Sequence, residues 1–174
     1  MNKLAYKISS LIKNTNPEET SSVEVMQYAL NIILNSILIF LGTLLISWLL
    51  GNLNESIIFI IFFSSLRFLS GGFHLKTATA CNIVTILLCT LTPYLITFPN
   101  NRVWIINLIS LLIMFLFAPN PDKNAQIQPQ LYPTLKILSI ILVSLNFFIS
   151  STVIGLAFLV QSLTIIPLKR RIKS

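Results

Sequence analysis

Residues 30–50 read LNIILNSILIFLGTLLISWLL, and none of them carries a charge. An α-helix that crosses the hydrocarbon core of a bilayer needs about 20 predominantly apolar residues, so this stretch is long enough for one crossing. Just upstream, Ser21 or Ser22 can cap the start of the same helix with a side-chain oxygen. The stretch therefore predicts a long membrane-spanning helix that ends near Leu50 and Gly51.

Five further apolar stretches follow, at 57–69, 81–96, 103–117, 135–149 and 153–167. Long apolar runs favour helices over the strands of a membrane barrel, which alternate apolar and polar residues over about ten positions. Several of the runs are short, so tilting or a locally thinner bilayer must help them to cross. We expect an all-α membrane protein, a bundle of about six transmembrane helices, with four crossings and two shallow helices as the alternative.

The composition of the chain is that of a membrane protein. Of its 174 residues, 55% are hydrophobic and 10% are charged, and the mean hydropathy is +0.84. Soluble domains carry about 25% charged residues. We therefore exclude an ordinary soluble domain and expect a single membrane domain over residues 1–174.

The net charge of +7 arises from basic residues that flank the apolar runs, where they contact lipid headgroups, and no nucleic-acid partner is expected. With six crossings and a cytoplasmic N-terminus, every Lys and Arg except Arg102 lies on the cytoplasmic side. This positive-inside pattern predicts a multi-pass protein of the cell membrane with both termini in the cytoplasm. Trp48 and Trp104, near the outer ends of their spans, are expected to be interfacial anchors.

Residues 1–16 form a separate segment ahead of the first long span. Its apolar and basic residues recur at helical spacing, the pattern of an amphipathic helix that lies in the membrane interface. They are Leu4, Ile8, Leu11 and Ile12 with Lys3, Lys7 and Lys13. A polar, acidic stretch follows in place of a cleavage site, so we expect no removable signal peptide.

The loop between the second and third spans carries the most reactive residues, and over 67–81 it reads RFLSGGFHLKTATAC. It contains the chain's single histidine, His74, one of its two cysteines, Cys81, and the adjacent glycines Gly71 and Gly72. A thiol becomes a nucleophile when an imidazole takes its proton or when a helix N-terminus stabilises the thiolate. Residues 70–81 are thus a candidate catalytic loop, although loop histidines are usually surface residues and a cysteine at a helix start usually packs.

His74 and Cys81 would lie about 10.5 Å apart along the axis of one uninterrupted helix, which is too far for proton transfer. The chain must therefore fold back between them. The glycine pair can end the second span with backbone conformations closed to other residues, and Thr77 or Thr79 can cap the third span. Cys81 would then lie in the first turn of that helix, where the helix dipole favours a thiolate.

The other cysteine, Cys89, lies eight residues after Cys81 on the same predicted helix, and a separation of about 12 Å is too long for a disulfide. Cys89 is also about two turns deeper in the bilayer, so we expect it to pack in the core. One histidine and two separated cysteines cannot supply the three or four ligands of a usual zinc site. We expect neither a metal nor another cofactor.

The order arginine, Gly-Gly, aromatic residue, histidine and, seven residues later, cysteine in 67–81 resembles the signature of AgrB, the membrane endopeptidase of Gram-positive quorum-sensing systems. The run Ala-Pro-Asn-Pro-Asp-Lys at 118–123 is similar to a segment that follows the fourth span in that family. The resemblance covers most of the chain. The residues after Asp122 differ, because they are richer in Gln and Pro than the basic segment of the family.

The resemblance implies a cysteine endopeptidase that removes the C-terminal tail of an autoinducing-peptide precursor. His74 would act as general base and Cys81 as nucleophile, through a thioester that an internal Cys or Ser of the peptide opens to close a thiolactone or lactone ring. The implied partners are the precursor peptide, the lipid bilayer and a second copy of the chain in a homodimer.

Two charged residues of the resembling segments are weaker candidates for the site. Arg67 either supports the site, for example by holding a carboxylate of the substrate, or merely extends its charge from the helix end to the membrane surface. Asp122 either meets a basic or amphipathic peptide or is solvated.

A polar stripe on the first long span offers further candidates, because polar groups at membrane depth usually face a protein interior. Gln27, or a backbone N–H near Cys81, is a candidate oxyanion donor, and Glu24 is a candidate to orient His74. The stripe continues through Tyr28, Asn31 and Asn35, and helix packing or a dimer contact explains it equally well.

A non-catalytic small membrane subunit or a transporter component is the alternative function. A transporter would need an ionisable residue inside a span, and apart from Glu24 near one end the predicted spans contain none of that kind.

Overall fold

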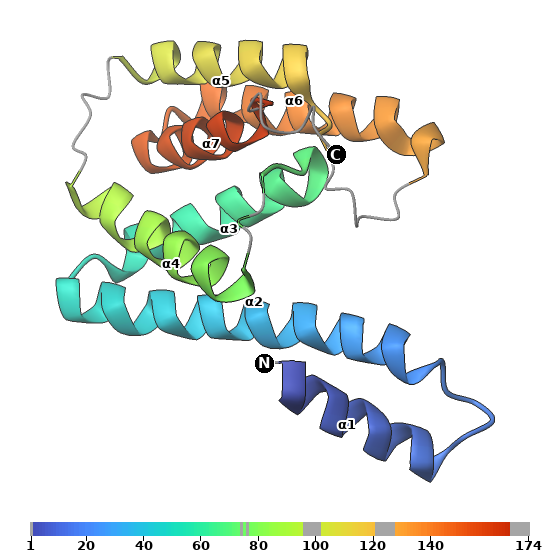
Figure 1. Cartoon of the computed structure of the whole chain (residues 1–174). Coiled ribbons are helices and arrows are strands. Elements are labelled where there is room, and N and C mark those ends of the chain that lie inside the picture. Colours follow the sequence, from blue (N-terminus) through green and yellow to red (C-terminus); the bar gives the residue numbers. More distant parts are fainter. Residues whose placement is uncertain (1, 74, 76, 96–101, 121–127, 168–174) are drawn as a thin grey trace.

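The computed structural model of the chain describes residues 2–73, 75, 77–95, 102–120 and 128–167. These residues are mostly helical, and no strand occurs among them (Figure 1). The helices are α1 (Asn2–Thr15), α2 (Val23–Leu50), α3 (Leu53–Ser70), α4 (Ala78–Leu95), α5 (Val103–Phe117), α6 (Tyr132–Ile149) and α7 (Thr152–Ile165), with a 3₁₀ turn, η2 (Pro129–Leu131), before α6. The all-α fold class predicted from the sequence is confirmed.

The apolar helices α2 to α7 lie where the sequence predicts six apolar stretches. Among the described residues, four helices are long and apolar enough to cross a membrane: α2, α3, α4 and the run Pro129–Ile149 that contains α6. With 15 and 14 residues, α5 and α7 are shorter, and α7 is only about 21 Å long against a hydrocarbon core of about 30 Å. The chain is a membrane protein, and six crossings stay a prediction.

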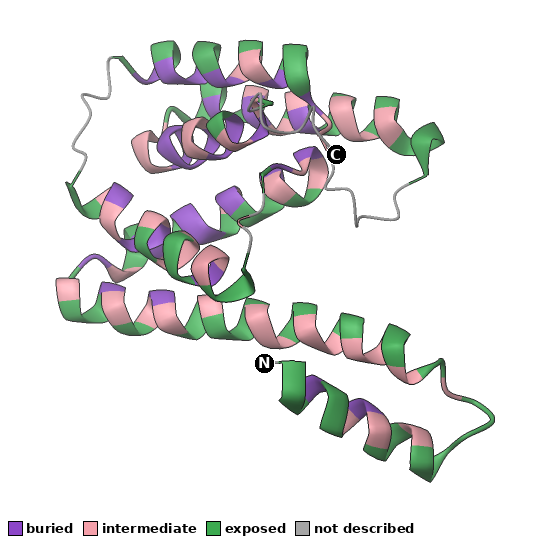
Figure 2. Ribbon diagram, viewed as in Figure 1, coloured by how far each residue is buried: buried purple, intermediate pink, exposed green. Residues whose placement is uncertain are grey.

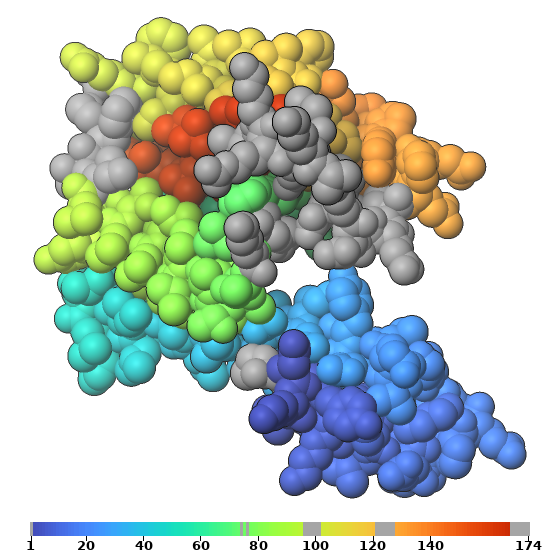
Figure 3. Space-filling view, in the orientation of Figure 1, coloured from blue at the N-terminus to red at the C-terminus, as the bar shows by residue number. Residues whose placement is uncertain are grey.

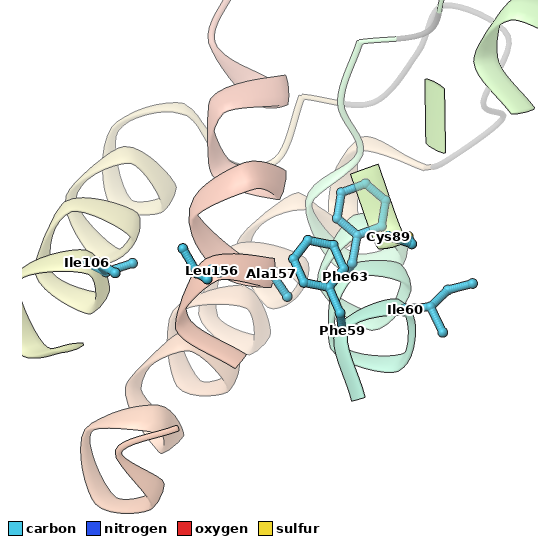
Figure 4. Close-up of a cluster of buried hydrophobic side chains, with 7 residues drawn as sticks. All are labelled: Phe59, Ile60, Phe63, Cys89, Ile106, Leu156 and Ala157. Carbon is cyan, nitrogen blue, oxygen red and sulfur yellow. The ribbon is translucent and has the colours of Figure 1, made fainter. Parts of the chain in front are cut away.

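The short helix α7 lies inside the bundle, between α3 and α5, and most of its residues are buried (Figures 1 and 2). One apolar cluster joins Phe59 and Phe63 of α3 to Leu156 and Ala157 of α7 (Figure 4). Cys89 of α4 belongs to this cluster and is fully buried, which agrees with its predicted packing role. Because its neighbours shield α7 from lipid, α7 can be shorter than the bilayer is thick.

The ends of α2, α3 and α5 lie on the sides of the bundle that the predicted topology requires. The C-terminal end of α2 and the N-terminal end of α5 lie on one side of the bundle, and the C-terminal end of α3 lies on the other (Figure 1). The first two ends carry Trp48 and Trp104, whose side chains are 67% and 56% exposed, and the third carries Arg67. The tryptophans and Arg67 are thus separated along the bundle, while the orientation in the membrane stays a prediction.

The helix α1 packs along the N-terminal part of α2 through Ala5 and Ser9, and α1 and this part of α2 form an arm that projects from the bundle (Figure 3). Lys13 stabilises the loop between α1 and α2, because its Nζ donates hydrogen bonds to two carbonyls of that loop at 2.6 and 2.8 Å. Ser22 caps α2 by accepting from the N–H of Val25 at 3.4 Å, as one of the two predicted caps. An interfacial position of α1 stays a prediction.

Candidate active site

The N-terminus of α4 positions Cys81. Thr77 caps the helix, because its hydroxyl accepts a hydrogen bond from the N–H of Ala80 at 3.2 Å and its carbonyl accepts from the N–H of Cys81 at 3.1 Å. This is one of the two caps predicted from the sequence. The Cys81 side chain is partly exposed and lies in the first turn of the helix, at the positive end of its dipole.

The chain leaves α3 through the glycine pair that the sequence predicts as a turn. Gly71 has φ = +72° and Gly72 has φ = +138°, conformations that L-residues with a side chain rarely adopt. Space is limiting at Gly72 as well, since a Cβ atom there would lie 2.6 Å from Oγ1 of Thr164 and 3.3 Å from Nε2 of Gln161. Both features require glycine at position 72.

Residues 70–73 are held by backbone hydrogen bonds to two other parts of the chain. The N–H of Gly72 donates to the carbonyl of Asn120 at 3.0 Å, and the N–H of Asn120 donates to the carbonyl of Ser70 at 2.8 Å. The N–H of Phe73 donates to the carbonyl of Thr164, in α7, at 2.9 Å. The segment after α5 and the end of α7 therefore fix the loop that leads to His74.

Arg67, in α3, stabilises the same loop through hydrogen bonds. One guanidinium nitrogen donates to the carbonyl of Phe73 at 2.9 Å, and the other donates to Oε1 of Gln161 at 3.4 Å. The guanidinium also lies over the ring of Phe63, 6.0 Å from its centroid. These contacts direct the Arg67 side chain into the protein; contact with a substrate carboxylate stays a prediction.

A partly open cavity of about 560 Å³ lies between α2, α3 and α4, and both Cys81 and Arg67 line it. Most of its lining is apolar, from side chains such as Ile39, Ile60 and Phe63. A second cavity, of about 790 Å³, is lined by the start of α1, by α2 and by the start of α4. The two cavities share Asn35, Ala78 and Asn82, so the N-terminus of α4 separates them.

The polar stripe of α2 contributes to this region only through its deeper part. Asn35 accepts a hydrogen bond from the side-chain amide of Asn82 at 2.9 Å, next to Cys81. Gln27 lies about 12 Å before Asn35 along the helix axis, Glu24 is exposed farther out, and neither lines either cavity. The structure does not bring these two residues to Cys81, and their predicted roles stay untested.

Two of the predicted site residues, His74 and Asp122, lie outside the described residues. Within the described part of the chain, no three His, Cys, Asp or Glu side chains are grouped so that they could hold a metal ion.

Sequence reasoning missed the residues that hold the candidate catalytic loop in place: Gln161, Thr164 and Asn120. Gln161 is the most informative of them, because it is fully buried in an apolar helix and yet polar. An amide at such a position must find partners inside the protein, and this signal was available in the sequence of 152–165.

The two thiols differ in accessibility, which predicts selective modification. We expect N-ethylmaleimide to alkylate Cys81 at least about tenfold faster than Cys89 in the folded, detergent-solubilised protein, because Cys89 is fully buried and Cys81 is partly exposed. Mass mapping of the labelled peptides measures both rates. Equal rates would contradict the packing of α4 against α3 and α7.

Comparison with known proteins gives one consistent result. The family model of accessory gene regulator B (AgrB) matches residues 2–167. A putative AgrB-like protein of Halalkalibacterium halodurans is 27% identical over 174 residues, which cover 97% of this chain and 88% of the relative. Accessory gene regulator protein B of Staphylococcus intermedius is 30% identical over 83% of this chain and 73% of the relative. Protein FsrB of Enterococcus faecalis is 25% identical over 95% and 73%. No solved structure matches the chain.

Proposed function

Because the chain belongs to the accessory gene regulator B family, we propose that it is a membrane cysteine endopeptidase that processes an autoinducing-peptide precursor. It removes the C-terminal tail of the precursor through a thioester on Cys81 and promotes closure of a thiolactone or lactone ring. The precursor peptide is the proposed partner, and the enzyme acts without a cofactor.

The position of Cys81 carries the proposal. Its thiol lies in the first turn of a capped helix, is partly exposed, and lines a cavity large enough for part of a peptide. Phe73, the residue before His74, has its N–H bonded to Thr164 and its carbonyl bonded to Arg67. A nucleophile needs a base that is held in place, and these contacts fix the backbone directly ahead of the proposed base.

In the first half of the reaction, His74 takes the proton of the Cys81 thiol, and Sγ attacks the carbonyl carbon of the scissile peptide bond. When the tetrahedral intermediate collapses, the carbon–nitrogen bond breaks and His74 gives the proton to the leaving amine. The tail departs with a free amino terminus, and the rest of the precursor stays on Cys81 as a thioester.

In the second half, a Cys or Ser inside the bound peptide attacks the thioester carbon and the bond to the Cys81 sulfur breaks. His74 takes the proton of the attacking thiol or hydroxyl and passes it to the departing Cys81 sulfur, and the peptide leaves as a ring. Exclusion of water favours this transfer over hydrolysis. The apolar lining of the α2–α3–α4 cavity suits that requirement, since it offers the acyl part of the substrate a site with few groups that bind water.

The developing oxyanion needs hydrogen-bond donors, and the N-terminus of α4 can supply them. The first N–H groups of a helix have no acceptors within the helix, and the N–H of Cys81 is the first to bond back, to Thr77. We therefore assign the oxyanion contacts to backbone N–H groups of residues 78 and 79, ahead of the alternative donor Gln27.

The proposed orientation has both termini and the Cys81 cavity on the cytoplasmic side of the cell membrane. The positive-inside pattern of the basic residues supports it, with Arg67 on the opposite side of the bundle from the Trp-bearing helix ends. A cytoplasmic site would meet the precursor where it is synthesised.

Trapping of the acyl-enzyme tests the proposal. The protein, reconstituted in liposomes, is mixed with the precursor encoded beside its gene, quenched in acid within seconds and analysed by intact mass spectrometry. We expect a mass increase equal to the precursor without its tail, located on the peptide that contains Cys81 and removed by neutral hydroxylamine, as a thioester should be.

The Cys89→Ala variant is the matched control and should form the same adduct, because Cys89 is buried in the core. An adduct on any residue other than Cys81, or cleavage of the precursor without a thioester, would rule out the mechanism. Absence of both cleavage and adduct would favour the non-catalytic membrane subunit.

A further inference from the structure

Among the described residues of α7, Gln161 is the only fully buried amide side chain, and an amide can donate two hydrogen bonds and accept two. It lies in the core of an apolar bundle, where an unpaired amide is costly. Such a residue either is satisfied by its surroundings or destabilises the fold. The hydrogen-bond partners of Gln161 therefore show which groups this side chain holds in place.

All the hydrogen-bonding capacity of the Gln161 amide is used. Its Nε2 donates to the carbonyl of Gly71 at 2.7 Å and to Oγ of Ser70 at 3.0 Å. Its Oε1 accepts from Arg67 at 3.4 Å and from the hydroxyl of Thr164 at 3.1 Å. One side chain thus joins the end of α3, the glycine turn and α7.

Two partners of Gln161 also hold Phe73. Arg67 donates to the carbonyl of Phe73 at 2.9 Å, and the carbonyl of Thr164 accepts from its N–H at 2.9 Å. Phe73 immediately precedes His74 in the chain. Loss of the Gln161 amide would free the guanidinium that bonds to the Phe73 carbonyl, while the Thr164 carbonyl belongs to the backbone of α7 and stays in place.

We propose that Gln161 is a positioning residue of the proposed peptidase: through Arg67 and Gly71 it fixes the backbone of residues 71–73, directly ahead of the proposed base His74. This inference rests on the proposed function. It explains why an amide stands there rather than an apolar residue or a carboxylate. A methionine of similar length makes none of the four hydrogen bonds, and a glutamate keeps the acceptor for Arg67 but loses both donors.

The test measures the reactivity of Cys81 in the full-length protein, in a Cys89→Ala background that leaves one thiol. The rate of alkylation by iodoacetamide is followed from pH 5 to pH 10, and precursor processing gives kcat and KM. Gln161→Met and Gln161→Glu are compared with His74→Ala. Ser162→Ala is the matched control, because within the described part of the chain this buried neighbour bonds only to the carbonyl of Leu159 in its own helix.

We expect Gln161→Met to move the midpoint of the alkylation profile upward by about one pH unit, toward a free thiol and in the direction of His74→Ala. We expect kcat to fall roughly 10- to 100-fold with KM changed less than about threefold, because a base misplaced by about 1 Å loses rate rather than affinity. Gln161→Glu should show a smaller shift of the same sign, and Ser162→Ala none.

The outcomes separate the inference from the function on which it rests. If His74→Ala shifts the profile and Gln161→Met and Gln161→Glu do not, the inference is wrong and the peptidase stands. If His74→Ala leaves the profile unchanged, the proposed function and the inference both fail. Should Gln161→Met not yield a monodisperse protein, Gln161→Glu decides by the same two measurements, since it preserves the size of the side chain.

Discussion

Replacing Cys81 by alanine should abolish processing of the precursor peptide, with a fall in rate of at least roughly 10³-fold, because the other thiol, Cys89, is fully buried and cannot form the thioester. Serine at the same position should be nearly as inactive, since a hydroxyl gives up its proton far less readily than a thiol. Cleavage of a precursor labelled at its C-terminal tail, in liposomes that contain equal amounts of each variant, measures the effect.

Cys89→Ala separates loss of chemistry from loss of fold. Cys89 is fully buried against α3 and α7, so its truncation should cost about 1 kcal/mol of stability while processing stays within about threefold of wild type. Cys81 is partly exposed at a helix start, and Cys81→Ala should therefore melt no lower than Cys89→Ala. Full activity of Cys81→Ala would exclude Cys81 as the nucleophile.

The helices could be predicted from the sequence because each carries a local signal. Residues 30–50 are apolar and uncharged over the length of a crossing, Ser22 offers a cap, and Gly51 ends α2 with φ = +76°. Such features depend on residues only a few positions apart. The central position of α7 could not be predicted in this way, because burial by α3 and α5 depends on contacts between distant segments.

The same distinction between local signals and contacts of distant segments applies to the candidate site. The turn at Gly71 and Gly72, the Thr77 cap and the place of Cys81 in the first turn follow from nearest neighbours, and the structure agrees with each. The partners of the loop lie about 50 and 90 residues away, at Asn120 and Gln161. The sequence instead pointed to the α2 stripe, of which Asn35 reaches the region through Asn82.

Gly72→Ala should be the most damaging substitution outside the proposed catalytic pair, with processing reduced roughly 100-fold or more and stability lowered by about 3 kcal/mol. Alanine would have to adopt φ = +138°, and its Cβ would lie 2.6 Å from Oγ1 of Thr164. That hydroxyl cannot simply rotate away, because its one proton is shared between the carbonyl and Oε1 of Gln161, at 2.7 and 3.1 Å. Thermal unfolding in detergent and the processing assay measure the two effects.

Gly51→Ala provides the matched control. Gly51 also has a positive φ, +76°, but a Cβ atom there would meet nothing within 4 Å, so only the backbone cost of about 1 kcal/mol applies and processing should persist. Adding Thr164→Ala to Gly72→Ala removes the nearest clashing atom but not the strained φ, and should recover part of the lost stability. Wild-type processing by Gly72→Ala would mean that the contact between the glycine turn and α7 does not matter for the reaction. A loss as large in Gly51→Ala would mean that strain alone, wherever it lies, inactivates the protein.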